Sequence, residues 1–174
     1  AIAPYFGEYI PFVENAGMEL DVVSADVPGF QINFTALEEK LTPNTQALIL
    51  NSPNNPSGTV YTAETLQKLA ALLREKSEAF GHPIYIVADE PYRELVYDGV
   101  EVPYIPAIYP NTIICYSYSK SLSLAGERIG YILVPRQAQD SRELYLAVSG
   151  ASRAIGHICA PALWQEVIAR CAHL

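Results

Sequence analysis

The sequence predicts an α/β fold in which a mainly parallel sheet carries helices on both of its faces. Two observations support this prediction. Short apolar segments rich in β-branched residues alternate with amphipathic helical segments, and clusters of polar residues follow three of the apolar segments. A chain of 174 residues that is 50% apolar can bury a single core. We find no internal repeat and no low-complexity linker.

Three elements are expected before the first strand of the main sheet. Residues 4–16 have a helical pattern, and residues 19–23 have the composition of a short strand. A second short helix is expected over residues 35–41. Glu38 is placed three positions after Thr35, so the two side chains are predicted to form a capping box at the start of this helix.

The main sheet is expected to contain four strands, near residues 46–50, 84–89, 112–116 and 129–134. Residues 62–80 form an amphipathic helix between the first two strands. Thr62 is its expected cap and Gly81 its expected end, and its apolar stripe consists of Leu66, Leu69, Ala70 and Leu73. The proline-rich residues 102–110 are predicted to be a loop. Residues 137–174 are predicted to be helical, with a break near Pro161.

Three polar clusters each follow a predicted strand. They are NSPNNPSG at residues 51–58, ADEPYREL at 88–95 and SYSKSLSLAGERIG at 117–130. Taken singly, the first indicates a tight turn, the second a helix-capping acid and the third a solvated lysine. Because ligands bind at the carboxyl ends of the strands in open α/β sheets, the three clusters together predict a single site.

The third cluster has the composition of a covalent cofactor site. Lys120 can form an imine with an aldehyde, and the hydroxyl groups of Ser117 and Ser119 can donate hydrogen bonds to a phosphate. Arg128 offers a planar guanidinium group that binds phosphate oxygens in pairs. An aldehyde and a phosphate on one ring describe pyridoxal phosphate, which is the predicted cofactor.

These motifs resemble those of the fold type I pyridoxal-phosphate enzymes, and specifically the class I/II aminotransferases of the aspartate aminotransferase kind. The motifs also occur in the family's order and spacing. The matching positions are the attachment signature from Ser117 through Lys120 and Arg128 to Gly130, the Asn-Pro-Ser-Gly element at residues 55–58, and the Asp-x-x-Tyr element formed by Asp89 and Tyr92. From the family's usual geometry we also expect a cis peptide bond between Asn55 and Pro56.

The resemblance implies catalytic roles for Asp89, Tyr92 and Lys120. Asp89 would pair with the pyridine nitrogen of the cofactor and keep it protonated, so that the ring can accept electrons from a substrate carbanion. Tyr92 and Asn55 would hydrogen-bond the 3-hydroxyl oxygen of the cofactor. Lys120 would hold the cofactor at rest and then, as a neutral amine, transfer the α-proton of the substrate.

The resemblance also implies how the phosphate is held and what the substrates are. Arg128, Ser117 and Ser119 would anchor the phosphate throughout the reaction. The substrates would be an L-amino acid, with aspartate as the first candidate, and a 2-oxo acid. Members of the family usually complete each site with residues of a second subunit, so a homodimer is expected for the full-length protein.

The composition is that expected of a cytoplasmic protein. No apolar run is long enough to span a membrane, and the first residues lack the pattern of a signal peptide. A net charge of -8 argues against a general nucleic-acid surface. The three cysteines are odd in number and lack the spacing of metal ligands, so we expect reduced thiols and no metal site.

Several parts of the family's active site were not located in the sequence. They are the upstream phosphate-binding loop, the aromatic residue that stacks on the cofactor ring, and the downstream small domain whose arginine binds the substrate carboxylate. We therefore expect residues 1–174 to be the central part of the cofactor-binding large domain, without the upstream arm and loop and without the small domain. The chain alone is expected to be inactive, because it would hold both cofactor and substrate loosely.

Two alternative functions remain open. A carbon-sulfur lyase of the same fold would release ammonia and pyruvate instead of transferring the amino group to form a new amino acid and keto acid, but such lyases tend to carry histidine where Tyr92 stands. A transcriptional regulator could use an aminotransferase-like domain to sense an effector, and it would carry a winged-helix domain upstream. The full-length sequence would separate the regulator from the enzymes, and the reaction product would separate the two enzymes.

Overall fold

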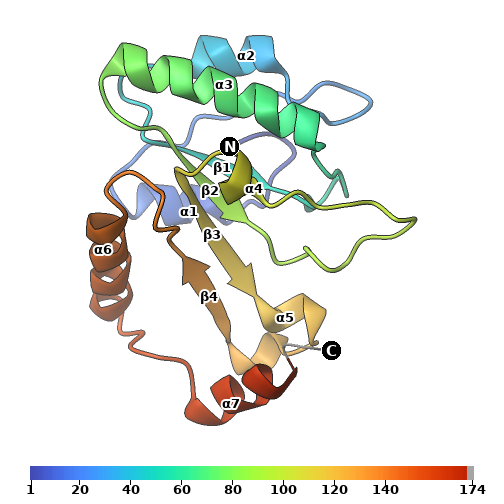
Figure 1. The fold of residues 1–174 in the computed structure, drawn as a ribbon, viewed down its shortest axis with the longest axis vertical. Coiled ribbons are helices and arrows are strands. Elements are labelled where there is room, and N and C mark those ends of the chain that lie inside the picture. Colours follow the sequence, from blue (N-terminus) through green and yellow to red (C-terminus); the bar gives the residue numbers. More distant parts are fainter. Residues whose placement is uncertain (172–174) are drawn as a thin grey trace.

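The computed structural model describes residues 1–171, and these residues contain a four-stranded sheet with the strand order β1-β2-β3-β4 (Figure 1). The strands are β1 (Ala47–Asn51), β2 (Tyr85–Asp89), β3 (Thr112–Ser117) and β4 (Gly130–Leu133). The pairs β1 with β2 and β2 with β3 are parallel, whereas β4 runs antiparallel to β3. The prediction of a mainly parallel sheet is therefore confirmed.

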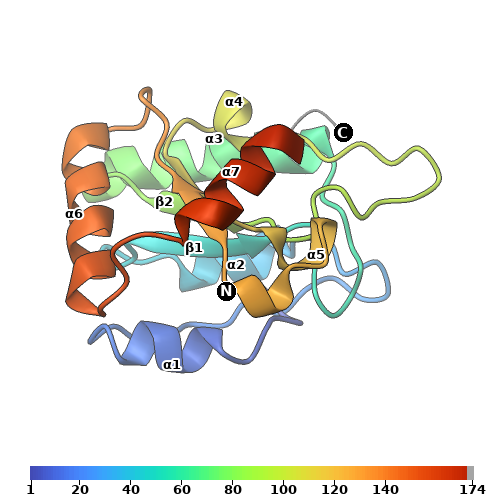
Figure 2. The same cartoon turned by 90° about the horizontal axis from the view of Figure 1, so that it is seen from below.

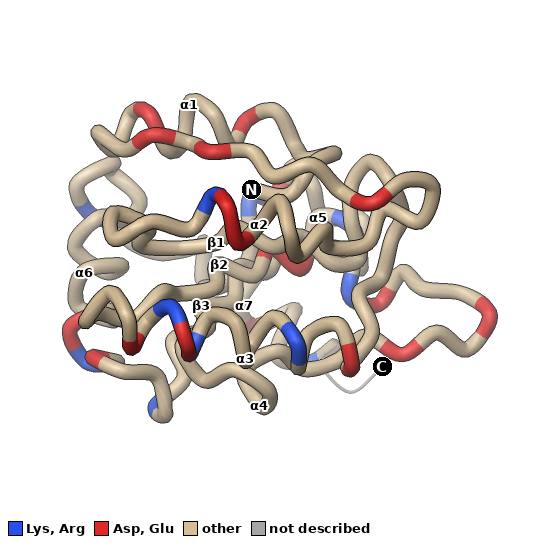
Figure 3. The backbone as a smooth tube through the Cα atoms, turned by 90° about the horizontal axis from the view of Figure 1, so that it is seen from above, with Lys and Arg blue, Asp and Glu red and all other residues tan. Residues whose placement is uncertain are grey.

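Helices lie on both faces of the sheet, as predicted. Figures 2 and 3 show α3 (Ala63–Phe80) and α4 (Ile105–Ile108) on one side of β1 and β2, and α1 (Tyr9–Glu14) on the other. The strands alternate accordingly. The core beneath α3 receives, from β1 to β3, the side chains of Leu48, Leu50, Ile86, Ala88, Ile114 and Tyr116. By the same alternation, Asp89 lies on the face that α1 covers.

The helix α3 follows its sequence prediction closely. The side chain of Thr62 accepts a hydrogen bond from the main-chain N–H of Thr65 at 3.1 Å, which caps the first turn. Gly81 ends the helix in the left-handed region, with φ of 79°. The predicted stripe of Leu66, Leu69, Ala70 and Leu73 is buried against the sheet. The packing of these four side chains against the sheet holds α3 in place.

The N-terminal part differs from its prediction. The first helix spans only Tyr9–Glu14, because Pro11 lacks an N–H and is tolerated only in a first turn, so a helix starting at residue 4 would place it in the interior. Residues 19–23 form no strand. Val23 instead makes an isolated parallel bridge with Ile2. A strand requires several consecutive residues to pair with a neighbouring segment, and here only Val23 pairs.

The second helix, α2 (Phe34–Lys40), is capped differently from the prediction. Asn33, not Thr35, is the N-cap, and its side chain accepts from the main-chain N–H of Ala36 at 3.0 Å. Glu38 does not form the predicted capping box. Its carboxylate instead pairs with Lys76 of α3 at 2.7 Å, because it points across to the neighbouring helix.

The C-terminal half contains one correction and one confirmation. The predicted loop at 102–110 includes the single helical turn α4, which proline permits because Pro106 stands in its first turn. The helical prediction for the last part of the chain holds for α6 (Ser141–Ala154) and α7 (Ala162–Cys171), which are separated by the predicted break. The end of that prediction, at residues 172–174, lies outside the described residues.

Acidic positions are distributed over several helices and loops, with basic positions among them (Figure 3). Within residues 1–171, no helix combines the length and the apolar character that a membrane crossing requires.

Candidate active site

The candidate site lies at the carboxyl edge of the three parallel strands. These strands end at Asn51, Asp89 and Ser117, and the register pairs Asn51 with Asp89 and Asp89 with Cys115. Each of the three polar clusters therefore begins at this edge. The predicted residues Asp89 and Ser117 also lie on the same face of the sheet, because Cys115 stands opposite Asp89 and Ser117 follows two positions later.

The carboxylate of Asp89 accepts a hydrogen bond from the phenolic hydroxyl of Tyr9 in α1. Burial raises the pKa of Asp89, and the hydrogen bond from Tyr9 partly opposes that shift. Burial also raises the pKa of the neighbouring Cys115 thiol to about 11, and the charge of Asp89 adds to this shift. Asp89 is thus a half-buried carboxylate held from one side, beside a thiol that stays protonated at neutral pH.

Tyr9 is a site residue that the sequence analysis did not identify. Burial and the hydrogen bond to Asp89 raise the pKa of Tyr9 well above its usual range, so the hydroxyl remains a donor at any pH of interest. Its ring stacks on Tyr5 at a centroid distance of 6.3 Å, and Phe6 meets it edge-on at 5.8 Å. The three aromatic residues in the segment PYFGEY could have indicated a site here. These residues were predicted only to form part of a helix.

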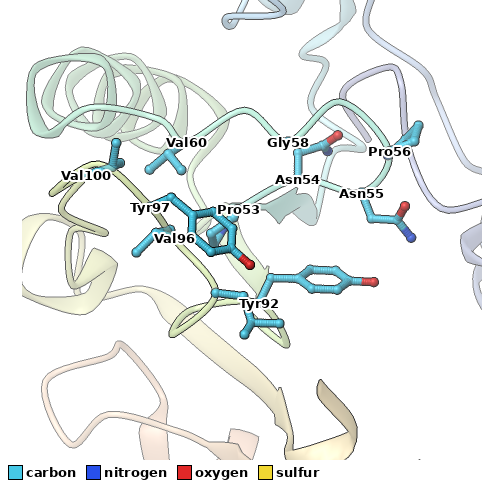
Figure 4. Close-up of a pocket in the computed structure, with 11 residues that line it drawn as sticks. Pro53, Asn54, Asn55, Pro56, Gly58, Val60, Tyr92, Val96, Tyr97 and Val100 are labelled. Atoms are coloured by element: carbon cyan, nitrogen blue, oxygen red, sulfur yellow. The ribbon is translucent and has the colours of Figure 1, made fainter. Parts of the chain in front are cut away.

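Asn55 and Tyr92 line one pocket together. This pocket has a volume of about 360 Å³ and lies between the loop after β1 and the loop after β2. Figure 4 shows both residues at one end of it, whereas Val60, Val96 and Val100 occupy the other end. The expected cis peptide bond between Asn55 and Pro56 is present. The two residues predicted to contact one cofactor oxygen thus face the same pocket.

Asp89 and Ser117 line a second pocket, of about 480 Å³. Its floor is the face of β2, β3 and β4, and its wall comes from α6 and the segment that follows it. The lining residues include Cys115, Gly130, Ile132, Ser152 and His157. Neither of these two pockets is lined by all the predicted site residues.

The lysine segment begins where β3 ends. Ser117 caps the short helix α5 (Tyr118–Ser121), and its hydroxyl lies 2.7 Å from the hydroxyl of Ser119. Lys120 is exposed in this turn. The two serine hydroxyls are thus adjacent to each other and precede the lysine directly, as a phosphate site next to an amine requires.

Arg128 does not reach the two pockets. Its guanidinium group donates to the main-chain oxygen of Ala125 at 2.9 Å, and its backbone is left-handed, with φ of 53°. The side chain is therefore folded onto its own turn and is exposed. The sequence placed this residue correctly before the last strand, but the local contact with Ala125 could not be foreseen from it.

The polar groups at this edge match the polar groups of pyridoxal phosphate. A carboxylate has two oxygens, and Tyr9 contacts one of them, so the second oxygen of Asp89 can accept from a protonated ring nitrogen. The adjacent hydroxyls of Ser117 and Ser119 suit phosphate oxygens, and the exposed amine of Lys120 suits an aldehyde. The ring nitrogen, the phosphate and the aldehyde of the cofactor thus each have a matching group on this edge.

The fold is that of part of the large domain of the fold type I class. A family model described as "Aminotransferase class I and II" matches residues 1–173, and the chain therefore belongs to this family. A probable N-acetyl-LL-diaminopimelate aminotransferase of Bacillus subtilis is 32% identical over 133 residues, which cover 76% of this chain and 32% of that protein. The chain thus spans about a third of the length of such curated relatives.

Solved structures agree with this assignment. An amino transferase of Eubacterium rectale is 60% identical, with a TM-score of 0.94, over 96% of this chain and 42% of that one. A mutant aspartate aminotransferase of Thermus thermophilus is 33% identical, with a TM-score of 0.77, over 90% of this chain and 40% of that one. The family resemblance and the fold type inferred from the motifs are confirmed.

Proposed function

We propose that the full-length protein containing this chain is a pyridoxal-phosphate-dependent aminotransferase. It transfers an amino group between an L-amino acid, with aspartate as the first candidate, and a 2-oxo acid. The observation that carries this proposal is the meeting of the motifs at one sheet edge, where Asp89 and Ser117 share a face and a pocket. The residues proposed to hold the cofactor are Asn55, Asp89, Tyr92, Ser117, Ser119, Lys120 and Arg128.

Asp89 is proposed to bind the ring nitrogen. Burial raises the pKa of this carboxyl group in the cofactor-free chain. A positive charge close to it would favour the ionised form and so lower that pKa again. When bound, the cofactor supplies an aldehyde that combines with amines and a protonated ring that accepts an electron pair. Asp89 contributes by keeping the ring nitrogen protonated.

Lys120 and Tyr92 are proposed to act nearer to the reacting atoms. Lys120 is exposed directly after the serine pair, so its amine can attach to the aldehyde and can later carry a proton to and from the substrate α-carbon. Tyr92 and Asn55 line the same pocket and are proposed to hydrogen-bond the 3-hydroxyl oxygen. Arg128 would have to leave Ala125 to bind the phosphate, which requires a rotation of its side chain.

The amino donor is the least determined part of this proposal. Relatives of similar identity are named aspartate, aspartate/prephenate and aromatic-amino-acid aminotransferases. Aspartate is retained as the first candidate because two of these three names contain it. We further propose that the full-length protein is a cytoplasmic homodimer, and that residues 1–174 alone do not transaminate.

The proposal is tested on the full-length protein with added pyridoxal phosphate. We expect a visible absorption band and keto-acid formation from aspartate and 2-oxoglutarate, and we expect Lys120→Ala to remove both signals. Lys40→Ala is the matched control, because Lys40 is an exposed lysine at the end of α2, where it pairs with Asp21. Full activity of Lys120→Ala would overturn the proposal. Release of ammonia and pyruvate from cysteine, a substrate with a carbon-sulfur bond, would favour the lyase alternative.

A further inference from the structure

The side chain of Asn51 connects two of the segments that carry candidate cofactor residues. Asn51 is the last residue of β1 and is 5% exposed. Its Nδ2 donates to the main-chain oxygen of Asp89 at 2.7 Å. Its Oδ1 accepts from the main-chain N–H of Asn55, also at 2.7 Å. One buried amide therefore bonds the end of β2 and the loop after β1 at the same time.

Both hydrogen bonds end on main-chain atoms. They fix the backbone of Asp89 and Asn55 without using the side chains of these two residues. Strand pairing already holds Asn51 beside Asp89. Asn55 lies beyond the end of β1, where strand pairing no longer acts, so the bond to Asn51 is what ties its main-chain N–H to the sheet.

We propose that Asn51 is a positioning residue that sets the distance between Asn55 and Asp89, and so keeps the contacts to the 3-hydroxyl oxygen and to the ring nitrogen of the cofactor at a fixed spacing. This inference rests on the proposed function, because that function assigns the 3-hydroxyl oxygen to Asn55 and the ring nitrogen to Asp89. Residue 51 must donate to a carbonyl and accept from an N–H. An uncharged amide does both in one protonation state, whereas an ionised carboxylate can only accept.

A matched pair of truncations in the full-length protein separates positioning from general stability. Ser52 is 3% exposed, and its hydroxyl accepts from the main-chain N–H of Tyr61 at 3.1 Å. Asn51→Ala and Ser52→Ala thus both remove buried hydrogen bonds at the same turn, but only the first releases Asn55 and Asp89. We expect Asn51→Ala to raise the dissociation constant for pyridoxal phosphate about tenfold or more, and Ser52→Ala to change it less than about threefold.

Amide hydrogen exchange of the cofactor-free protein tests the same contact without using the cofactor. In Asn51→Ala the N–H of Asn55 loses its acceptor, so we expect its exchange to accelerate about tenfold or more. In Ser52→Ala the accelerated amide should be that of Tyr61 instead. Unchanged exchange at Asn55 in Asn51→Ala would show that the side chain of Asn51 does not hold this loop.

Asn51→Asp provides a further test, because a positioning role of Asn51 predicts a pH-dependent change in cofactor binding that a merely structural role does not. A protonated Asp at position 51 can donate to Asp89 and accept from Asn55, as the native amide does, whereas its ionised form cannot donate. The dissociation constant of this variant, divided by that of the wild type, should therefore approach one as the pH is lowered and rise at neutral pH. This variant also decides the question if Asn51→Ala fails to fold.

Three outcomes would overturn the inference: equal weakening by Asn51→Ala and Ser52→Ala, unchanged exchange at Asn55, or a pH-independent ratio for Asn51→Asp. A different result marks failure of the proposed function. If the wild-type protein binds no pyridoxal phosphate, the assignment of Asn55 and Asp89 to that cofactor is wrong. The exchange comparison then still decides whether Asn51 holds the loop to the sheet.

Discussion

Tyr9 donates a hydrogen bond to the carboxylate of Asp89, although 80 positions separate the two residues in the sequence. The contact joins α1 to the carboxyl end of β2, across the face of the sheet opposite to α3. It also orients one side of the carboxylate, so that the second oxygen is left to a ligand. A long-range contact of this kind makes the geometry of Asp89 depend on the N-terminal segment.

We predict that Tyr9→Phe weakens cofactor binding by the full-length protein. The change removes a hydrogen bond to a charged group, for which about 1.5–3 kcal/mol is typical, so the dissociation constant should rise about tenfold or more. It also removes the interaction that lowers the pKa of Asp89, so that pKa should rise further. Absorbance titration with pyridoxal phosphate at several pH values measures both effects.

Tyr5→Phe is the control for this change. Tyr5 stacks on the ring of Tyr9, and its phenylalanine variant keeps that stacking. We therefore expect Tyr5→Phe to bind the cofactor like the wild type. Equal binding by Tyr9→Phe and the wild type would contradict the role given to the Tyr9 hydroxyl.

A second prediction concerns the stability of the cofactor-free protein against pH. Burial raises the pKa of Asp89 above its ordinary value of 3.8. The folded state then binds more protons than the unfolded state between 3.8 and the raised pKa, so the free energy of unfolding falls as the pH rises through this window. Asp89→Asn removes the titrating group, and the variant should lose this part of the pH dependence.

Asp89→Asn should therefore be at least as stable as the wild type at pH 7 while binding the cofactor much more weakly. Asp98→Asn is the control, because Asp98 is exposed and has a φ of 57°, a conformation that asparagine tolerates. Urea unfolding of the full-length, cofactor-free protein between pH 3.5 and 8 measures the effect. A pH dependence equal to that of the wild type would mean that Asp89 keeps an ordinary pKa.

The sequence predicted those parts of the fold that depend on local pattern. The apolar stripe, cap and end of α3 lie within one segment, and the strands β1 to β3 are marked by short apolar runs with a polar residue at each end. The strand expected at 19–23 failed because pairing depends on a distant partner, and only Val23 finds one, in Ile2. The single turn α4 failed because four residues carry no helical period.

The candidate site was predictable to the same extent. Motif order placed Asp89 and Ser117 at the carboxyl ends of two predicted strands, and the structure puts them on one face of adjacent strands. The contacts of Tyr9 and Asn51 with Asp89 were not predicted, because each joins segments that only the folded chain brings together. The orientation of Arg128 was not predicted either, since a single bond to Ala125 determines it.

A third prediction concerns Glu90, the neighbour of Asp89. Glu90 is 1% exposed, and its carboxylate pairs with Arg93 at 2.8 Å. Burial raises the pKa of Glu90, and the charge of Arg93 opposes this shift. Arg93→Ala would leave a buried carboxylate without its partner, which typically destabilises a protein by about 3–5 kcal/mol. Urea unfolding at pH 8 should reveal this loss.

The deficit of Arg93→Ala should shrink as the pH falls, because the raised pKa of Glu90 lets the group become neutral in the folded state. The double change Glu90→Gln with Arg93→Ala should recover stability at pH 8 for the same reason. Arg170→Ala is the matched control, since its ion pair with Glu166 at 2.9 Å is exposed and is worth at most about 1 kcal/mol. A double variant no more stable than Arg93→Ala would contradict this account.

The last prediction concerns Gly130, the first residue of β4. A Cβ atom at this position would lie 2.2 Å from the main-chain oxygen of Tyr116 and 3.1 Å from the Cα of Ser117. Neither atom belongs to a flexible side chain, so Gly130→Ala must push β4 away from β3 and disturb the end of the strand that carries Ser117. Overpacking of this kind typically costs about 1–3 kcal/mol. Gly150→Ala is the matched control, because Gly150 lies inside α6 and the added Cβ would meet no atom within 4 Å beyond its chain neighbours and the backbone of its own helix. Alanine there should stabilise the helix by up to about 1 kcal/mol. Urea unfolding of the two full-length variants should therefore give changes of opposite sign, and a neutral Gly130→Ala would show that β3 and β4 can separate without loss.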